Sequence, residues 1–323
     1  MNRLGAWVMG LTLLAGAGVW SVNRTESDWV NRRIDASAGL RLASAHPITV
    51  AVVDTGILPQ AALDGRRQSG YDFAAGSALP PHLINPHGTA VAGMVHSVDP
   101  AARILDVRLS DTAGQTTLRK AVDALRWAAG LEVAGVPLNP FPARVINASF
   151  VLKTVPHDGC VPAMQRAVNE ILAHGSVIVV AAGNTNAPAW RNTPAGCRGV
   201  ITVAATDTQD RRAPYSDWGA AIALSAPGGT RAEGVDVWWG QHRSERRGSS
   251  YAAPLVAGAA SLLLAQHPEF TPAEVKAILQ RSARPFSRGG CDPQHRAGCG
   301  AGVLDVAGAL RSAASPLALG SVH

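Results

Sequence analysis

Three segments of the chain each place one chemically versatile side chain among small residues. Asp54 lies in "VVDTGI", His87 in "PHGTAVAG" and Ser250 in "GSSYAAP". A serine hydroxyl is a weak nucleophile at neutral pH, and it needs a base such as imidazole within hydrogen-bond reach. A carboxylate bonded to the far ring nitrogen would hold the imidazole in one tautomer and stabilise the imidazolium. These residue types can form a nucleophilic site if the fold brings them together.

The elements that must position these residues follow from apolar runs and helical patterns. Continuous apolar runs predict buried parallel strands, and segments with a helical period alternate with them. The predicted strands span residues 48–56, 102–109, 143–150, 176–184, 199–206 and 221–228, and the predicted helices 88–97, 117–130, 161–175 and 271–283. This alternation predicts an α/β fold, a three-layer sandwich with a mostly parallel central sheet flanked by helices.

Polar residues occur where the predicted strands end. In sheets of this class, chemistry collects at the carboxyl ends of the strands. Asp54, Ser149 and Asn184 all lie at such ends. An asparagine after glycine is by itself most often a turn residue. Asn184 therefore becomes a candidate only because it accompanies the other residues.

The three segments together resemble the subtilisin-like serine proteases, the subtilase family. The family's Asp motif appears as Asp54-Thr55-Gly56, its His motif as residues 87–93, and its Ser motif as residues 248–254, with Ser249 where threonine is usual. The motifs occur in the family's order, and the resemblance extends over nearly the whole chain after residue 29. It implies a subtilisin-like fold.

The resemblance also implies a secreted serine endopeptidase that cleaves peptide bonds through an acyl-enzyme. Ser250 would be the nucleophile, His87 the general base, and Asp54 the residue that orients His87. Asn184 would donate to the oxyanion together with the backbone N–H of Ser250. The helix after Ser250 would point its positive end at the site. We expect Pro254 in the first turn of that helix, where it removes no hydrogen bond.

Substrate binding is expected at two segments that match the family's edge strand and pocket. The residues concerned are Ser149, Phe150 and Val151, and Ala182 and Gly183. The edge is usually Ser-Leu-Gly, and a glycine would let the substrate backbone approach closely, whereas Val151 adds bulk. The shape of the pocket and the breadth of specificity therefore stay open.

Four cysteines fit an oxidising compartment. Their spacing suggests two local disulfides, Cys160 with Cys197 and Cys291 with Cys299. A zinc site is the alternative, but no CxxC motif and no close histidine pair accompany these cysteines. Disulfides are the favoured prediction.

The chain begins with features of an export signal. A basic start at Arg3, an apolar stretch and small residues predict a signal peptide over residues 1–17, with an uncut membrane anchor as the alternative. We expect a secreted or periplasmic protein with an N-terminal segment over residues 18–45, one peptidase domain over 46–312 and a tail over 313–323. The inhibitory propeptide of secreted relatives does not fit before the first strand, so we hypothesise folding without one.

Composition limits the partners. The net charge is +6, but the basic residues are dispersed and no aromatic residues interleave with them, which argues against nucleic-acid binding. We expect a monomer that acts on protein or peptide substrates without a required cofactor. Structural calcium is possible but unsupported, because Ala62 stands where many relatives carry a calcium-binding Asp, and Asp64 is out of register.

Two other functions remain open at this point. The chain could be a dedicated maturation protease for one partner protein, which the bulk of Val151 and the lack of room for a propeptide both suggest. It could also be a non-catalytic binding protein on the same scaffold, because a fold alone does not guarantee chemistry.

Overall fold

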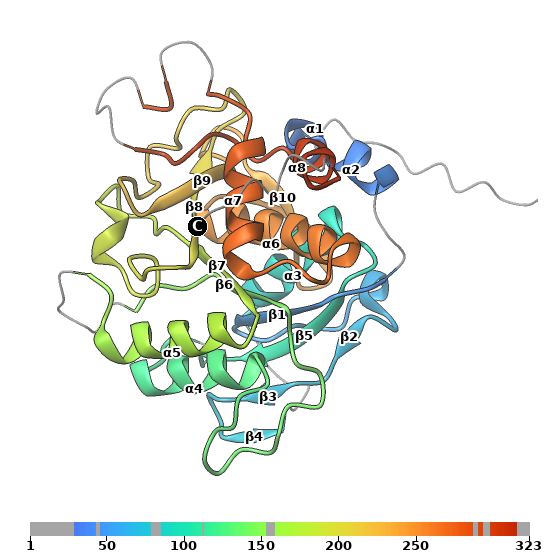
Figure 1. Ribbon diagram of the computed structural model, residues 1–323. Helices are drawn as coiled ribbons and strands as arrows, with labels where there is room; N and C mark the ends of the chain where they lie inside the picture. Colours follow the sequence, from blue (N-terminus) through green and yellow to red (C-terminus); the bar gives the residue numbers. More distant parts are fainter. Residues whose placement is uncertain are drawn as a thin grey trace, which may run out of the picture.

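Six long parallel strands form the centre of the molecule, as the sequence predicted. The computed structural model describes residues 29–42, 46–78, 85–111, 113–152, 159–286, 290–292 and 298–314 (Figure 1). The six strands are β1 (Thr49–Asp54), β5 (Arg103–Arg108), β6 (Val145–Ala148), β7 (Val177–Ala181), β8 (Ile201–Thr206) and β9 (Ile222–Pro227). They lie in the order β5-β1-β6-β7-β8-β9, and every neighbouring pair is parallel.

Three short strands extend this sheet beyond β5, and the sequence did not predict them. They are β2 (Arg67–Gln68), β3 (Tyr71–Asp72) and β4 (Ser77–Ala78). β2 and β3 pair with β5, and β4 is antiparallel to β3. Two-residue strands bury too few side chains to leave a periodic pattern in the sequence.

Helices cover both faces of the sheet. α3 (His87–Val98) and α6 (Ser249–Gln266) pack together on one face, and α4 (Leu118–Ala128) and α5 (Pro162–Ala173) cover the other (Figure 1). Alternate residues of β1 serve the two layers, because Val50 and Val52 join the core with α3 and α6 whereas Ala51 and Val53 join the core with α4 and α5. Burial on both faces explains why the strands are continuous apolar runs.

The C-terminal helices lie beside α6. They are α7 (Pro272–Ser282) and α8 (Val306–Ala313). Thr271 and Glu274 form a capping box at the start of α7, with Pro272 at the first helical position. The helix predicted over residues 271–283 is therefore confirmed.

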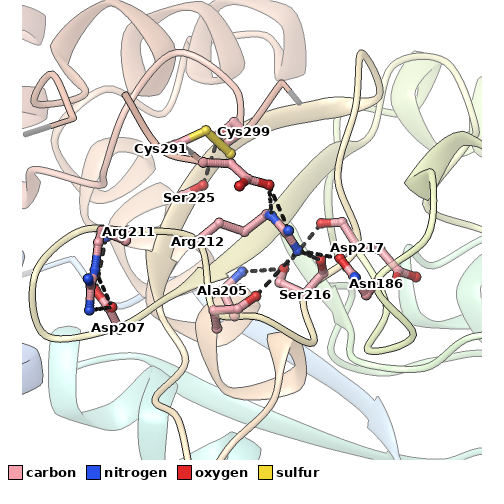
Figure 2. Close-up of a disulfide and its surroundings, with 12 residues drawn as sticks. Asn186, Ala205, Asp207, Arg211, Arg212, Ser216, Asp217, Ser225, Cys291 and Cys299 are labelled. Atoms are coloured by element: carbon pink, nitrogen blue, oxygen red, sulfur yellow. Dashed lines mark hydrogen bonds and ion pairs between the residues drawn. A yellow bond between two sulfur atoms is a disulfide. The ribbon is translucent and has the colours of Figure 1, made fainter. Parts of the chain in front are cut away.

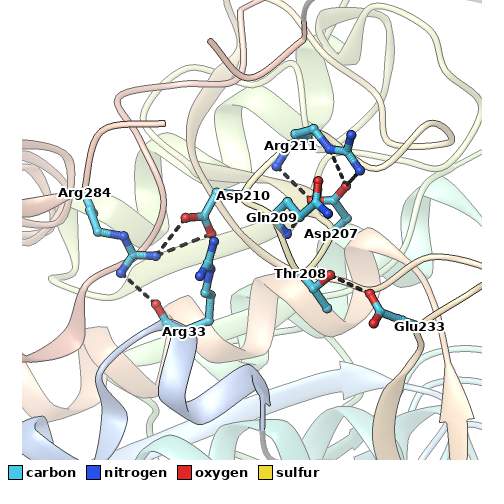
Figure 3. Close-up of polar contacts among 8 residues, drawn as sticks. All are labelled: Arg33, Asp207, Thr208, Gln209, Asp210, Arg211, Glu233 and Arg284. Carbon is cyan, nitrogen blue, oxygen red and sulfur yellow. Dashed lines mark hydrogen bonds and ion pairs between the residues drawn. The ribbon is translucent and has the colours of Figure 1, made fainter. Parts of the chain in front are cut away.

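A short N-terminal segment packs onto the domain through charged contacts. It consists of α1 (Trp29–Arg33) and α2 (Ala36–Leu42). Arg33 and Arg284 both pair with Asp210, at 2.7 and 3.2 Å, and Arg284 also donates to the Arg33 carbonyl oxygen (Figure 3). These bonds join the start of the described chain to a loop after β8 and to the segment after α7.

A hairpin that the sequence did not predict leads into α6. Its strands are β10 (Val235–Trp239) and β11 (His242–Arg246), which pair in antiparallel register. Trp238 packs against α3 at Gly93, where an added Cβ would lie 2.8 Å from the indole. Only two residues separate the end of β11 from the start of α6, so the hairpin anchors the segment that leads to Ser250.

Both disulfides occur as predicted. Cys160 is bonded to Cys197. Cys291 is bonded to Cys299, and Figure 2 shows this second disulfide. The predicted signal peptide and most of the predicted tail lie outside the described residues. Within the described ranges, no helix combines the length and apolarity needed to cross a membrane.

Candidate active site

Asp54 and His87 meet because β1 ends where α3 begins. His87 Nδ1 donates to Asp54 Oδ1 across 2.7 Å, and Asp54 is almost completely buried. Thr55 holds the junction, since its hydroxyl accepts from the Gly88 N–H and donates to the Asn85 carbonyl oxygen. A Cβ on Gly88 would lie 2.4 Å from the Gly56 carbonyl oxygen, so only glycine permits this close approach.

The environment of His87 favours a basic imidazole. Burial lowers the pKa of His87, while the charge of Asp54 and its hydrogen bond raise it, and the net effect is a pKa above the ordinary 6.5. The bond to Nδ1 leaves Nε2 as the nitrogen that can accept a proton. Histidine held in this way can act as a general base.

Ser250 is the second residue of α6 and, like Asp54, lies where the parallel strands have their carboxyl ends. The residue after it, Tyr251, places its ring beside that of His87, with the centroids 5.7 Å apart. The Ser250 hydroxyl donates to the Ser149 carbonyl oxygen across 3.3 Å, and among the described residues it has no hydrogen bond to His87. Catalytic hydrogen bonds are often formed only once substrate binds.

Two N–H donors converge beside Gly248. The Asn184 side-chain oxygen accepts from the Ser249 N–H and from the Ser249 hydroxyl, at 2.8 and 2.9 Å, so the amide nitrogen faces the other way. A Cβ placed on Gly248 would lie 3.6 Å from that nitrogen and 3.7 Å from the Ser250 nitrogen. The space in front of Gly248 can therefore hold an oxygen that accepts from both groups.

A cavity of about 600 Å³ opens next to Ser250. Of the five residues predicted to bind substrate, four line it: Ser149, Phe150, Val151 and Gly183. Ala182 does not, because it is completely buried beneath the cavity wall. The cavity lies between the residues that follow β6 and those that follow β7, as expected for a site at the carboxyl ends of parallel strands.

Sequence reasoning missed Asp217, which builds one wall of this cavity. Its buried carboxylate accepts from the backbone N–H groups of Thr185 and Ala187, at 2.8 and 2.9 Å, and from the Asn192 side-chain amide at 2.7 Å. A Cβ on Gly183 would lie 2.1 Å from the same carboxylate. No motif marks Asp217 in the sequence, because its partners are backbone N–H groups and side chains of a loop 25 to 32 residues earlier in the chain.

Arg212 connects this wall to a disulfide. Its guanidinium donates to Asp292, at 2.7 and 2.9 Å, and to the side-chain oxygen of Asn186, and its N–H donates to the Cys291 carbonyl oxygen (Figure 2). Arg212 and Asp292 are both largely buried. Cys291 and Asp292, at one end of this disulfide, therefore help to fix the loop that follows Asn184.

Pro254 does not lie where the sequence suggested. α6 begins at Ser249, so Pro254 is its sixth residue and lies in the helix interior rather than in the first turn. An N–H at position 254 would donate to the Ser250 carbonyl oxygen, and proline has none. The expectation failed because the helix begins directly behind Gly248 and not later in the motif.

A metal centre finds no support in the described ranges, where no three His, Cys, Asp or Glu side chains form a group that could hold an ion. Ala62 and Asp64, considered above for calcium, lie at an exposed turn.

Comparison with known proteins places the chain in a family. Residues 45–302 match the family described as "Subtilase family". The chain belongs to the subtilase family. This confirms the resemblance seen in the three motifs, and the match includes Asp54, His87 and Ser250.

Several bacterial proteases are similar in sequence. An extracellular protease of Xanthomonas campestris pv. campestris is 31% identical over 336 residues, which cover 90% of this chain and 56% of that protein. An extracellular basic protease of Dichelobacter nodosus is 31% identical over 314 residues, which cover 82% of this chain and 50% of that protein. This subtilase thus spans about half the length of the curated relatives it matches.

Solved structures confirm the fold of this subtilase. A protease from Pseudoalteromonas arctica PAMC 21717 superimposes with a TM-score of 0.79 and 29% identity, covering 90% of this chain and 98% of that one. A cold-adapted subtilisin-like serine proteinase gives a TM-score of 0.68 and 27% identity, covering 82% and 90%. The predicted α/β sandwich with a mostly parallel sheet is confirmed.

Proposed function

We propose that this subtilase is a serine endopeptidase that uses Ser250, His87 and Asp54. The observation that carries the proposal is the 2.7 Å hydrogen bond between buried Asp54 and His87, beside the first turn of α6, in which Ser250 is the second residue. The names of its relatives as extracellular proteases support the same activity.

The reaction would follow from this geometry. The Ser250 hydroxyl turns from the Ser149 carbonyl oxygen towards His87 Nε2, which takes its proton as the oxygen attacks the scissile carbonyl carbon. The carbonyl oxygen becomes an oxyanion that accepts from Asn184 and from the Ser250 N–H. His87 then protonates the leaving amine. In the second half of the reaction, His87 takes a proton from a water molecule that attacks the acyl-enzyme, and returns it to the oxygen of Ser250 as the acid product leaves.

The cavity favours an uncharged, apolar residue on the acyl side of the scissile bond. Phe150, Val151 and Leu152 supply apolar lining. The oxygens of Asp217 already accept from Thr185, Ala187 and Asn192, and the cation Arg191 lines the same cavity, so the site offers no unengaged carboxylate to a basic side chain. Lysine or arginine at this position would therefore lose hydration without gaining an ion pair.

The location and the organisation of the chain are part of the same proposal. The extracellular relatives and the two disulfides support export, with residues 1–17 as a signal peptide ahead of an N-terminal segment over 18–45. The peptidase domain would span residues 46–312, followed by a tail over 313–323. We propose a monomer that acts on protein or peptide substrates and does not bind nucleic acid.

A narrower function is the second candidate, because Val151 lines the cavity where a glycine would leave more room. In that case the enzyme would mature one partner protein.

Hydrolysis of unfolded casein tests both proposals: rapid digestion that is lost in Ser250→Ala supports a general endopeptidase. Intact casein, together with cleavage of short apolar peptides, would support the narrow role. No hydrolysis of any substrate would favour a binding protein.

A further inference from the structure

The side chain of Ser149 points towards the nucleophile's backbone rather than into the cavity. Its hydroxyl donates to the Ser250 carbonyl oxygen across 2.9 Å and accepts from the Asn147 side-chain amide, also at 2.9 Å. Asn147 is completely buried and Ser149 is 5% exposed. A substrate can therefore contact the backbone of Ser149. The Ser149 hydroxyl, however, already donates one hydrogen bond and accepts another within the protein.

Pro254 explains why the Ser250 carbonyl oxygen needs this partner. In a regular helix the oxygen would accept from the N–H four residues later, and Pro254 has no N–H. Ser250 is partly buried, and a carbonyl group left unpaired in a buried position costs about 1–3 kcal/mol, so a hydrogen-bond donor from elsewhere stabilises it. The Ser149 hydroxyl supplies this hydrogen bond from outside the helix.

We propose that Ser149 is a positioning residue for the nucleophile, acting through the Ser250 carbonyl group. The inference rests on the proposed function, in which Ser250 attacks the substrate. The Asn147–Ser149–Ser250 chain of hydrogen bonds fixes the peptide group that follows the nucleophile, and with it the direction of the Cα–Cβ bond of Ser250.

The bonds between the two serines run in both directions. Ser149 donates from its side chain to the Ser250 backbone, and Ser250 donates from its side chain to the Ser149 backbone at 3.3 Å. The second bond must break when the Ser250 hydroxyl turns to His87, but the first can persist. Ser149 also begins the segment that lines the substrate cavity, so one residue aligns the bound substrate with the attacking oxygen.

This arrangement predicts a specific coupling between two substitutions. Ser149→Ala removes the donor, and the nucleophile loses its alignment, which should lower kcat by about 10- to 100-fold with little change in KM. Pro254→Ala restores an N–H that can donate to the same carbonyl oxygen. In the Pro254→Ala background we therefore expect Ser149→Ala to lower kcat by less than about threefold, as in a double-mutant cycle.

Ser176 offers a matched control for loss of a buried serine. Its hydroxyl donates to the Ala143 carbonyl oxygen across 2.7 Å, and it is 2% exposed. It directly precedes β7 and so lies at the amino end of that strand, away from the active site at the carboxyl ends. Ser176→Ala should lower Tm as much as Ser149→Ala does, yet leave kcat unchanged. Ser149→Cys keeps the size of the side chain with a weaker donor, so it gives an intermediate kcat and covers the case in which the alanine variant fails to fold.

The experiment measures Tm, kcat and KM on an apolar peptide substrate, and the rate of fluorophosphonate labelling, for the full chain and these variants. A selective loss of kcat and labelling rate in Ser149→Ala, relieved by Pro254→Ala, supports the proposal. A loss of Tm alone, or a loss of kcat of the same size in both backgrounds, overturns it. If the wild type itself is neither labelled nor active, the proposed function fails instead.

Discussion

His87, the first residue of α3, donates to Asp54, the last residue of β1, across 2.7 Å. Asp54 is buried at the carboxyl end of β1, and the turn built by Thr55 and Gly88 keeps the two elements in contact. The chemistry proposed here depends on that contact, because it sets both the orientation of the imidazole and its basicity.

Asp54→Asn should reveal this dependence in the pH profile of kcat. His87 acts as a base only when neutral, so activity falls as pH drops through its pKa, which Asp54 raises above 6.5. Without the charge of Asp54, burial lowers this pKa, and the acid limb should move to lower pH while kcat falls about 10⁴-fold. Kinetics between pH 5 and 9 check this expectation. If the acid limb does not move in Asp54→Asn, a group other than His87 causes it, and the prediction fails.

Asn184→Ala should remove one donor to the oxyanion. We expect kcat to fall on the order of 10²–10³-fold with little change in KM, because the bond forms only in the transition state. Steady-state kinetics on a peptide substrate measure both values. An unchanged kcat would remove Asn184 from the mechanism.

Gly248→Ala should abolish hydrolysis, because the new methyl group would occupy the space in front of Asn184 and Ser250. Gly248 also has φ at +155°, which strains other residues. Gly175→Ala is the matched control: φ is +94° there, and no atom lies within 4 Å of an added Cβ. Both variants should lose Tm, but only Gly248→Ala should lose kcat. Substantial activity in Gly248→Ala would contradict the location of the oxyanion.

Asp106→Asn should change how stability depends on pH. Burial raises the pKa of Asp106 to about 6, although the positive charge of Arg67 opposes part of this rise. The folded state therefore binds a proton more tightly than the unfolded chain, and the wild type gains stability as pH falls from about 7 towards 4, by at most about 3 kcal/mol. Asparagine cannot titrate, so this gain should be missing from Asp106→Asn.

Urea denaturation of both proteins at several pH values measures that difference. The advantage of the wild type over Asp106→Asn should grow as pH falls. An advantage that grows as pH rises would mean that the Arg67 ion pair, at 2.7 Å, outweighs burial and lowers the pKa of Asp106 instead.

The sequence predicts the central sheet well because its strands are mostly buried on both faces and therefore read as largely apolar runs, although β5 carries Asp106 and β6 carries Asn147. It also predicts the residues at the strand ends, since short motifs carry them. Asp54 and His87 are found in this way although 33 residues separate them. Both disulfides join cysteines that are consecutive along the chain, 37 and 8 residues apart.

Features that depend on distant backbone groups could not be predicted in the same way. Asp217 shapes the cavity by accepting from backbone N–H groups of residues 185 and 187, and such partners leave no trace in residue types. The role of the Ser149 hydroxyl appears only once α6 is known to begin at Ser249, which leaves the Ser250 carbonyl oxygen without a helical donor.

The central claim is that Ser250 becomes nucleophilic because His87 and Asp54 act on it. Reaction with a fluorophosphonate, followed by peptide mapping of the intact chain, tests this most directly. We predict one phosphonate on Ser250, formed far more slowly in His87→Ala and absent in Ser250→Ala. A chain that hydrolyses peptides while Ser250 stays unmodified, or that labels equally fast in His87→Ala, would contradict the account.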